Sequence, residues 1–299
     1  MNPTPPPSPD RMLGKVLACL DESRYATPVC DYAAWSAERM GAPLSLLHVI
    51  PHPPGGRADE ARNLSGSIGF KAREGLLNEL ATLDAQRARL AMEQGRILLE
   101  GAAERARESG YEGPVEIRQR HGSLVDAALA LEPETRMLVL GKRGEDTATE
   151  HGHLGSQLEG VIRAMHHPVL IAQQSFSPPQ RIMFAWDGSR TATRGLETLS
   201  RSTLFRGIPV DVVTAGRDDD ATRVSLERAR VILEEGGVDV KTALLEGDPE
   251  EALLAYREDH DVDLIIMGAY GHSRIRRFLV GSTTTALLSR CRVSMMVLR

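Results

Sequence analysis

The sequence is poor in cysteine and contains no apolar run long enough to cross a membrane. Its three cysteines, Cys19, Cys30 and Cys291, are scattered along 299 residues, so they do not suggest the paired framework of a disulfide-stapled secreted domain. Reduced, partly buried thiols are expected, and a redox-sensing role for one of them is the alternative. No stretch approaches the ~20 apolar residues of a membrane helix, so no membrane partner is expected.

An excess of basic residues is also missing. Lysine and arginine number 36 against 41 acidic residues, for a net charge of −5, which argues against a nucleic-acid partner. The first ten residues, MNPTPPPSPD, are rich in proline and lack the apolar core of a signal peptide, so they predict a short disordered tail. We therefore expect a cytoplasmic globular protein.

Sequence elements of ATP-using enzymes are absent as well. There is no Gly-Lys-Ser/Thr phosphate loop, no Ser-Gly-Gly-rich loop of the ATP pyrophosphatase type and no His-Ile-Gly-His-like adenylyl-transfer element. No general base can be nominated, so no catalytic residue is predicted. No metal site is predicted either, because His151, His153, His166 and His167 lack the spacing of three or four converging ligands.

What the sequence does contain is an internal repeat. One apolar run ends at Asp21-Glu22-Ser23 and another at Asp187-Gly188-Ser189, an offset of 187 − 21 = 166. Further along, Gly141 recurs as Gly268, an offset of 268 − 141 = 127. The change of offset, 166 − 127 = 39, means that the first copy carries about 40 additional residues between its second and third strands.

Each copy alternates apolar β-runs with helical patterns in the order βαβ, αβ, αβ, αβ. This order predicts two tandem, doubly wound α/β domains, each with a parallel sheet of about five strands and helices on both faces. We assign a tail at residues 1–10, a first domain at 11–174, a linker at 175–180 and a second domain at 181–299.

The additional residues of the first copy lie at about 55–94. They begin with a polar, glycine-containing stretch, and from about Lys71 they show a helical stripe in which Leu76, Leu83, Leu90 and Ile97 fall seven apart. A helix packed across its own domain fits this pattern, and so does a dimerisation or lid helix.

Residues 263–288 combine a strand, a glycine-rich loop and the start of a helix. A helix N-terminus favours an anion, and glycines let a phosphate approach the backbone where a Cβ would clash. Positive charge in the loop favours the same ligand. The residues concerned are Gly268, Gly271, Gly281, Ser282 and Thr283, with the basic side chains of His272, Arg274, Arg276 and Arg277.

The spacing of Gly268, Gly271, Gly281 and Ser282 resembles the nucleotide loop of the universal stress protein family, in its ATP-binding branch. The resemblance covers nearly the whole chain after residue 11. It implies ATP as ligand, with or without Mg²⁺, and slow hydrolysis at most. In this family the last strand of a domain pairs with its counterpart across a two-fold interface. Here that implies pairing of Val169–Ala172 with Met295–Leu298 within the chain, and a homodimer of whole chains.

By the same resemblance, Asp187 matches the aspartate that contacts the nucleoside, and Ala215 and Met267 match positions that line the adenine pocket. A capping role for Asp187 in its Asp-Gly-Ser turn is the alternative, and the two roles are compatible. The predicted cofactor-binding residues are Ala185, Trp186, Asp187, Ala215, Met267, Gly268, Gly271, His272, Arg274, Gly281, Ser282 and Thr283.

The first copy departs from the pattern. Ten residues, not nine, separate Gly144 from Gly155, and the loop contains Glu145, Asp146 and Glu150, which would repel a polyphosphate. We expect weak nucleotide binding there or none, and a mainly structural role for this copy. The weaker candidate residues are Asp21, Gly141, Gly144, Gly155 and Ser156.

Three functions remain open. The first is a stress-response protein that binds an adenine nucleotide in its second domain. The second is an enzyme that uses ATP slowly to activate a substrate. The third is a module whose first-copy insertion closes over an apolar ligand or docks a protein. The intact second glycine loop favours the first.

Overall fold

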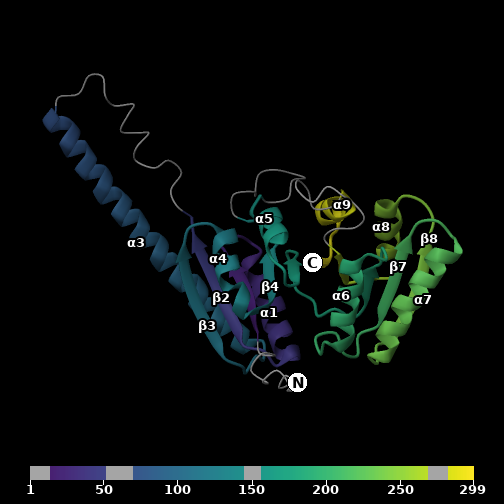
Figure 1. Cartoon of the computed structure of the whole chain (residues 1–299). Coiled ribbons are helices and arrows are strands. Elements are labelled where there is room, and N and C mark those ends of the chain that lie inside the picture. The colour runs from purple at the N-terminus through teal and green to yellow at the C-terminus, as the bar shows by residue number, and fades with distance from the viewer. Residues whose placement is uncertain (1–13, 52–69, 145–155, 269–281) are drawn as a thin grey trace, which may run out of the picture.

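The computed structural model describes residues 14–51, 70–144, 156–268 and 282–299. Both halves alternate strands and helices as the sequence predicts (Figure 1). The first half contains β1 (Lys15–Leu20), α1 (Ala26–Met40), β2 (Leu44–Ile50), α3 (Phe70–Glu108), β3 (Val115–His121), α4 (Leu124–Leu131), the short 3-10 helix η2 (Glu132–Glu134), β4 (Thr135–Gly141), α5 (Ser156–Ala164) and β5 (Val169–Ala172). The second half contains β6 (Ile182–Ala185), α6 (Arg190–Arg201), β7 (Val210–Ala215), α7 (Asp220–Glu235), β8 (Val240–Leu245), α8 (Pro249–Asp259), β9 (Leu264–Gly268), α9 (Ser282–Arg290) and β10 (Ser294–Leu298).

The ten strands form one sheet in the order β3-β2-β1-β4-β5-β10-β9-β6-β7-β8. Pairing is parallel within each half, and the two halves join where β5 and β10 pair antiparallel, with Met295 opposite Ile171. The expected α/β fold with a doubly wound parallel sheet is thus present in each half. Because β5 and β10 pair with each other, neither presents an unpaired edge.

Helices cover both faces of the sheet. Alternate residues of β1 point to opposite faces: Val16 belongs to the buried cluster that includes residues of α1, α3, α6 and α7, whereas Leu17 belongs to the cluster that includes residues of α4, α5, α8 and α9. This burial on both faces explains why the strands are nearly continuous apolar runs. The three cysteines are free and buried, and burial raises the pKa of Cys19 and of Cys30 to about 12.

Side chains of each half also bind the main chain of the other. The buried ammonium group of Lys142, which follows β4, donates hydrogen bonds to the carbonyl oxygens of Ser289 at 3.0 Å and Cys291 at 2.8 Å, at the end of α9. A cation is favoured at the C-terminal end of a helix. On the other face, Arg39 of α1 donates to the carbonyl oxygens of Leu204 and Arg206.

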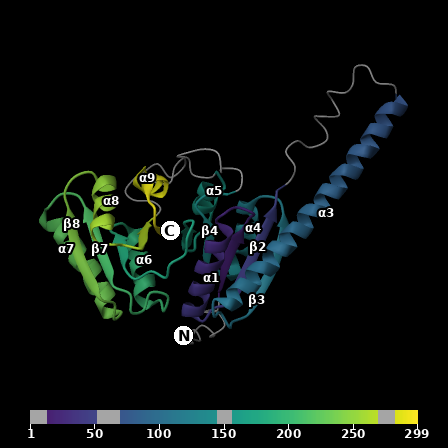
Figure 2. The same cartoon turned by 180° about the vertical axis from the view of Figure 1, so that it is seen from behind.

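The helix of the insertion, α3, is 39 residues long and only partly packed. Near its C-terminal end, Leu99 and Ala106 are fully buried against the sheet. Before that point the helix extends beyond the first half (Figures 1 and 2), and Leu83, Leu90 and Ile97 are 49%, 64% and 58% exposed. A helix packed across its own domain is therefore wrong for the described segment up to Leu90, whereas from Ala91 onward the helix packs on the first half.

No described helix is long and apolar enough to cross a membrane. Within the described ranges, no three histidine, cysteine, aspartate or glutamate side chains are grouped to hold a metal ion.

Candidate functional site

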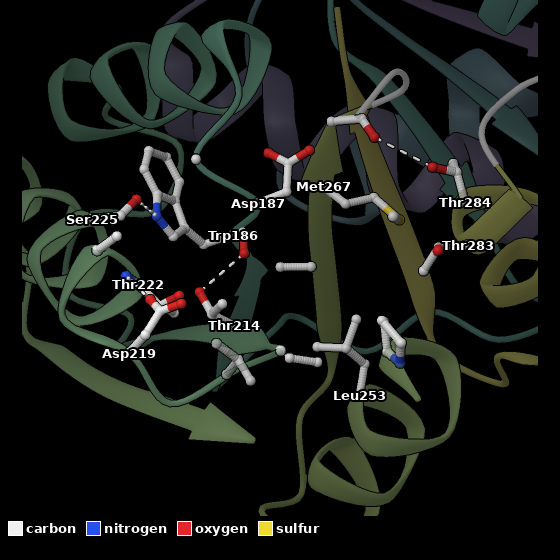
Figure 3. Close-up of a pocket in the computed structure, with 18 residues that line it drawn as sticks. Trp186, Asp187, Thr214, Asp219, Thr222, Ser225, Leu253, Met267, Thr283 and Thr284 are labelled. Carbon is white, nitrogen blue, oxygen red and sulfur yellow. Dashed lines mark hydrogen bonds between the residues drawn. The ribbon is translucent and has the colours of Figure 1, made fainter. Parts of the chain in front are cut away.

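The carboxyl ends of β6, β7 and β9 meet at a crevice in the second half. The chain passes from β6 outward through β7 and β8 on one side and returns to β9 and β10 on the other, and such a reversal of strand order leaves open space at the strand ends. A cavity of about 720 Å³ lies there, which is a usual size for a small-molecule site. Figure 3 shows side chains from strands and helices of the second half surrounding it.

Asp187 lines the cavity directly after β6 and opens a tight turn. Its Oδ1 accepts a hydrogen bond from the main-chain N–H of Ser189 at 2.9 Å, and the Ser189 hydroxyl in turn caps α6. Gly188 between them has a φ of +68°, in the left-handed region that favours glycine. Asp187 thus stabilises the turn, as the capping alternative expects, and also faces the cavity.

Trp186 lines the same cavity, but its indole ring is only 5% exposed. The ring N–H donates to the hydroxyl of Ser225 on α7 at 3.0 Å. Its main-chain oxygen accepts from the hydroxyl of Thr214 on β7, also at 3.0 Å. Trp186 therefore ties α7 and β7 to the end of β6 and supports the wall of the crevice.

The far side of the crevice is formed by the end of β9 and the start of α9. Met267 and Gly268 line it at the strand end, and Thr283 and Thr284 line it from the first turn of the helix. The buried hydroxyl of Thr284 donates to the carbonyl oxygen of Gly268 at 3.3 Å. This bond holds the N-terminal end of α9 beside the strand end, where its unpaired N–H groups favour an anion.

Of the twelve predicted cofactor-binding residues, seven line this cavity: Ala185, Trp186, Asp187, Ala215, Met267, Gly268 and Thr283. Ser282 is the first residue of α9. The remaining four, Gly271, His272, Arg274 and Gly281, lie outside the described residues.

Several residues that line the cavity were not predicted. Asp219 precedes α7 and caps it by accepting from the N–H of Thr222 at 2.8 Å. An Asp-x-x-Thr pattern before an apolar stripe signals such a helix start, but the pattern alone does not show that this helix end faces the crevice. The residues concerned are Gly188, Val213, Thr214, Gly216, Asp219, Ala221, Thr222, Ser225, Pro249, Leu253 and Thr284.

The α7 side and the α9 side of the crevice differ in charge. Hydrogen bonds from Thr222 lower the pKa of Asp219, so this carboxylate is ionised at neutral pH on the α7 side. A phosphate is disfavoured beside a carboxylate and favoured at the start of α9. Between them, Ala215, Leu253 and Met267 give an apolar surface. The arrangement suits a ligand with hydroxyl or amino groups at one end and an anion at the other.

The first half has a smaller crevice at the matched strand ends. Its cavity is about 350 Å³, and Asp21, Gly141 and Gly144 line it. The Oδ1 of Asp21 accepts from the N–H of Ser23 at 3.1 Å and from its hydroxyl at 2.5 Å. Of the other weaker candidates, Ser156 begins α5 and Gly155 lies outside the described residues.

A tyrosine packs against Gly141 in the first half, where the second half has a threonine beside Gly268. Tyr25 occupies the position matched to Thr191 (191 − 25 = 166). A Cβ added to Gly141 would lie 2.6 Å from the Cβ of Tyr25, closer than real Cβ contacts, whereas one added to Gly268 would lie 3.6 Å from Thr191 Cγ2. Packing alone therefore requires glycine at 141, while the protein leaves room for a side chain at 268.

The insertion also changes the wall of the first crevice. In the second half, α7 begins just after Asp219. The matched residue in the first half is Met92 (219 − 127 = 92), which lies in the interior of α3. Ala91 and Gln94 of that helix line the first cavity. A helix interior thus replaces a helix start at this position, and its main-chain N–H groups are used within the helix.

Comparison with known proteins gives matches along nearly the whole chain. The model of the universal stress protein family matches residues 12–173 and 215–299. Universal stress protein Slr1230 of Synechocystis sp. is 35% identical over 286 residues, which are 95% of this chain and 99% of that protein. A solved universal stress protein from Archaeoglobus fulgidus superposes with a TM-score of 0.71 at 21% identity, over 95% of this chain and 98% of the other. A universal stress protein solved in complex with cAMP covers 41% of this chain and 98% of its own, with a TM-score of 0.36 and 21% identity.

Proposed function

The chain belongs to the universal stress protein family, and we propose that it is a cytoplasmic stress-response protein whose second half binds ATP. The observation that carries this proposal is the crevice at the β6–β9 reversal, where an acid, an apolar surface and a helix N-terminus surround one cavity. In this arrangement Ala215 and Met267 contact the adenine ring. Asp187 accepts hydrogen bonds from the ribose hydroxyls. The phosphates lie at Gly268 and the start of α9.

The first half has a structural role in this proposal. Its cavity is about half as large, at 350 Å³ against 720 Å³. Tyr25 packs over Gly141, and Glu22 replaces the glycine that follows the aspartate in the second half. A nucleotide therefore has less room there.

Matched substitutions in the two halves test the assignment. Because a Cβ at position 268 meets only ordinary contacts, loss of binding in Gly268→Ala reports on the ligand rather than on folding. We expect about tenfold weaker binding of Mg-ATP, or more, in Gly268→Ala and Asp187→Asn. Asp21→Asn, the matched control, should bind like the wild type in isothermal titration.

The number of bound nucleotides decides between the halves. Acid release from protein purified without added nucleotide, followed by chromatography, should yield at most about one adenine nucleotide per chain. Titration with Mg-ATP should then bring the total to one occupied site per chain. Two sites per chain would contradict the structural role of the first half. No binding of Mg-ATP would favour the non-nucleotide function.

We further propose that hydrolysis is slow at most. The described side chains of the crevice supply contacts for a nucleoside, and we assign none of them as a general base. Release of inorganic phosphate from Mg-ATP should stay below one turnover per minute. Multiple turnovers per minute, with or without an acceptor, would instead favour an ATP-using enzyme.

We also propose that whole chains form a homodimer through α3. The exposed leucines at 83 and 90, with Ile97, lie seven residues apart on one side of its projecting segment. Two such stripes can pack together as in a coiled coil, and water is then removed from both. A second copy of the chain supplies the matching stripe, because a two-fold contact needs only one self-complementary surface.

A further inference from the structure

A second large cavity lies between the two halves. Its volume is about 500 Å³, and it shares no lining residue with the crevice of the second half. The first half contributes the start of β4 and the turn before β5, and the second contributes α6 and the end of β10. Helices α1 and α6 lie on either side of the middle of the molecule in Figures 1 and 2.

The lining of this cavity is strongly basic. Arg136, Arg194, Arg201 and Arg299 line it together with His166 and His167, and Glu197 is the one acidic residue that lines it with them. Within the described part of the chain, no carboxylate forms an ion pair with any of the first three arginines. Arg299 donates to the main-chain oxygens of Arg163 and Met165. Positive groups around one concave surface raise its potential and attract an anion.

The deeper wall is apolar. Phe205 and Leu298 are 4% and 5% exposed, and Leu204 and Met296 line the cavity beside them. Arginine guanidinium groups bind phosphate oxygens in pairs, through two parallel N–H groups. An apolar wall with arginines at its border therefore suits a small organic molecule that carries phosphate.

The two-fold relation between the halves shows that the equivalent place beside α1 is filled, unlike the place beside α6. Thr198 on α6 corresponds to Tyr32 on α1 (198 − 32 = 166). At Tyr32 the space is filled by the linker: the ring of Phe176 packs edge-on against it at 4.7 Å, and its hydroxyl donates to the oxygen of Ser177. Thr198 lines the cavity, and no described segment fills the corresponding space beside it.

The two matched places also differ in charge. Arg136 corresponds to Asp263 (263 − 136 = 127). Asp263 holds the linker by accepting from the main-chain N–H groups of Gln180 at 2.7 Å and Arg181 at 3.0 Å. An arginine cannot accept such bonds, and it offers donors to an anion instead. The arginines at 194 and 201 likewise replace Pro28 and Trp35 of α1.

We propose that this cavity is a second ligand site, which binds a small phosphate-bearing anion through Arg136, Arg194 and Arg201. Arg136 belongs to the first half and the other two to the second, so a bound anion bridges the halves. The ligand therefore stabilises the arrangement of the two halves in addition to the β5–β10 pairing. The proposal does not depend on nucleotide binding in the second half.

Titration with inorganic pyrophosphate at low ionic strength tests the site. The full-length chain carries Gly268→Val in every sample, so that binding in the crevice of the second half does not contribute. We expect one pyrophosphate per chain, and about tenfold weaker binding or more in Arg194→Gln/Arg201→Gln. The control Arg107→Gln/Arg228→Gln removes the same charge from two exposed positions and should leave the affinity unchanged. Circular dichroism checks that both double variants are folded.

Two results would overturn the assignment. One is the absence of pyrophosphate binding in the Gly268→Val chain. The other is an equal affinity in the Arg194→Gln/Arg201→Gln variant and its control, which would show binding to net charge rather than to the cavity. Neither result bears on ATP binding in the second half, which is measured separately with the chain that retains Gly268.

Discussion

At the scale of single residues, two glycines inside helices differ in what surrounds them. A Cβ added to Gly195 of α6 would lie 2.2 Å from Cδ1 of Leu298 and 3.3 Å from its Cβ. Leu298 is itself buried, and its Cβ and Cγ, both at 3.3 Å, would also have to give way. A Cβ added to Gly101 of α3 would meet no atom within 4 Å. One glycine is thus required by packing, and the other only weakens its helix.

Alanine at these two positions should change stability in opposite directions. We expect Gly195→Ala to lower the free energy of unfolding by about 1–3 kcal/mol through overpacking. Gly101→Ala should raise it by about 0.5–1 kcal/mol, because alanine loses less backbone entropy in a helix. Urea denaturation of the two variants beside the wild type measures both. Equal effects would show that Leu298 adapts without cost.

At the scale of elements, four charged side chains connect β1, β3 and η2. The ammonium group of Lys15 lies 2.6 Å from a carboxylate oxygen of Glu116 and 2.8 Å from one of Glu134. Arg118 contacts the same two carboxylates. The hydrogen bonds from Arg118 and then Lys15 lower the pKa of Glu134 from 4.5 to about 2. The cluster therefore links three elements of the first half.

The stability that Glu134 contributes should depend on pH. Because its pKa is lower in the folded state, this contribution is complete above pH 4.5 and is lost as the pH falls towards 2. Glu134→Gln should therefore lower the urea midpoint at pH 7 and lose this effect near pH 2. Since the carboxylate is 39% exposed, the effect should shrink in high salt. Glu112→Gln, at an exposed position, is the control. An equal drop of the urea midpoint at pH 7 in both variants would contradict the assignment.

At the scale of the whole molecule, the two halves use their equivalent elements differently. In the second half, α7 is 16 residues long and begins beside the crevice, whereas α3 of the first half extends to 39 residues. The additional turns extend away from the rest of the first half (Figure 2), and their apolar side chains at Leu83 and Leu90 are exposed. Exposed apolar stripes of this kind mark contact surfaces.

Self-association of the whole chain should therefore depend on the stripe of α3. We expect a dimer in sedimentation equilibrium for the wild type and a monomer for Leu83→Gln/Leu90→Gln, whose folds should be intact because both positions are exposed. Ala85→Gln/Ala88→Gln changes two exposed positions outside the stripe and should remain dimeric. A monomeric wild type, or a dimer that persists in the stripe variant, would rule out this interface.

Much of the fold could be predicted because its signals are local. The apolar runs at Leu44–Ile50 and Val169–Ala172 coincide with β2 and β5, and Ser123 and Pro249 mark the starts of α4 and α8. A strand or a helix start depends on residues close in sequence, so its pattern is visible without the fold. Seven predicted site residues line the crevice for the same reason, since they belong to motifs at strand ends.

The sequence by itself thus determined the tandem repeat, the α/β class and the family motif, all of which rest on spacing along the chain. Only the tertiary structure decided that Asp219 and Ser225 face the crevice, that Tyr25 crowds Gly141, and that α3 leaves its own domain. It also decided that Arg136 and α6 line one cavity at the junction of the halves. These contacts join distant segments, and they depend on how whole elements pack, which no local pattern contains.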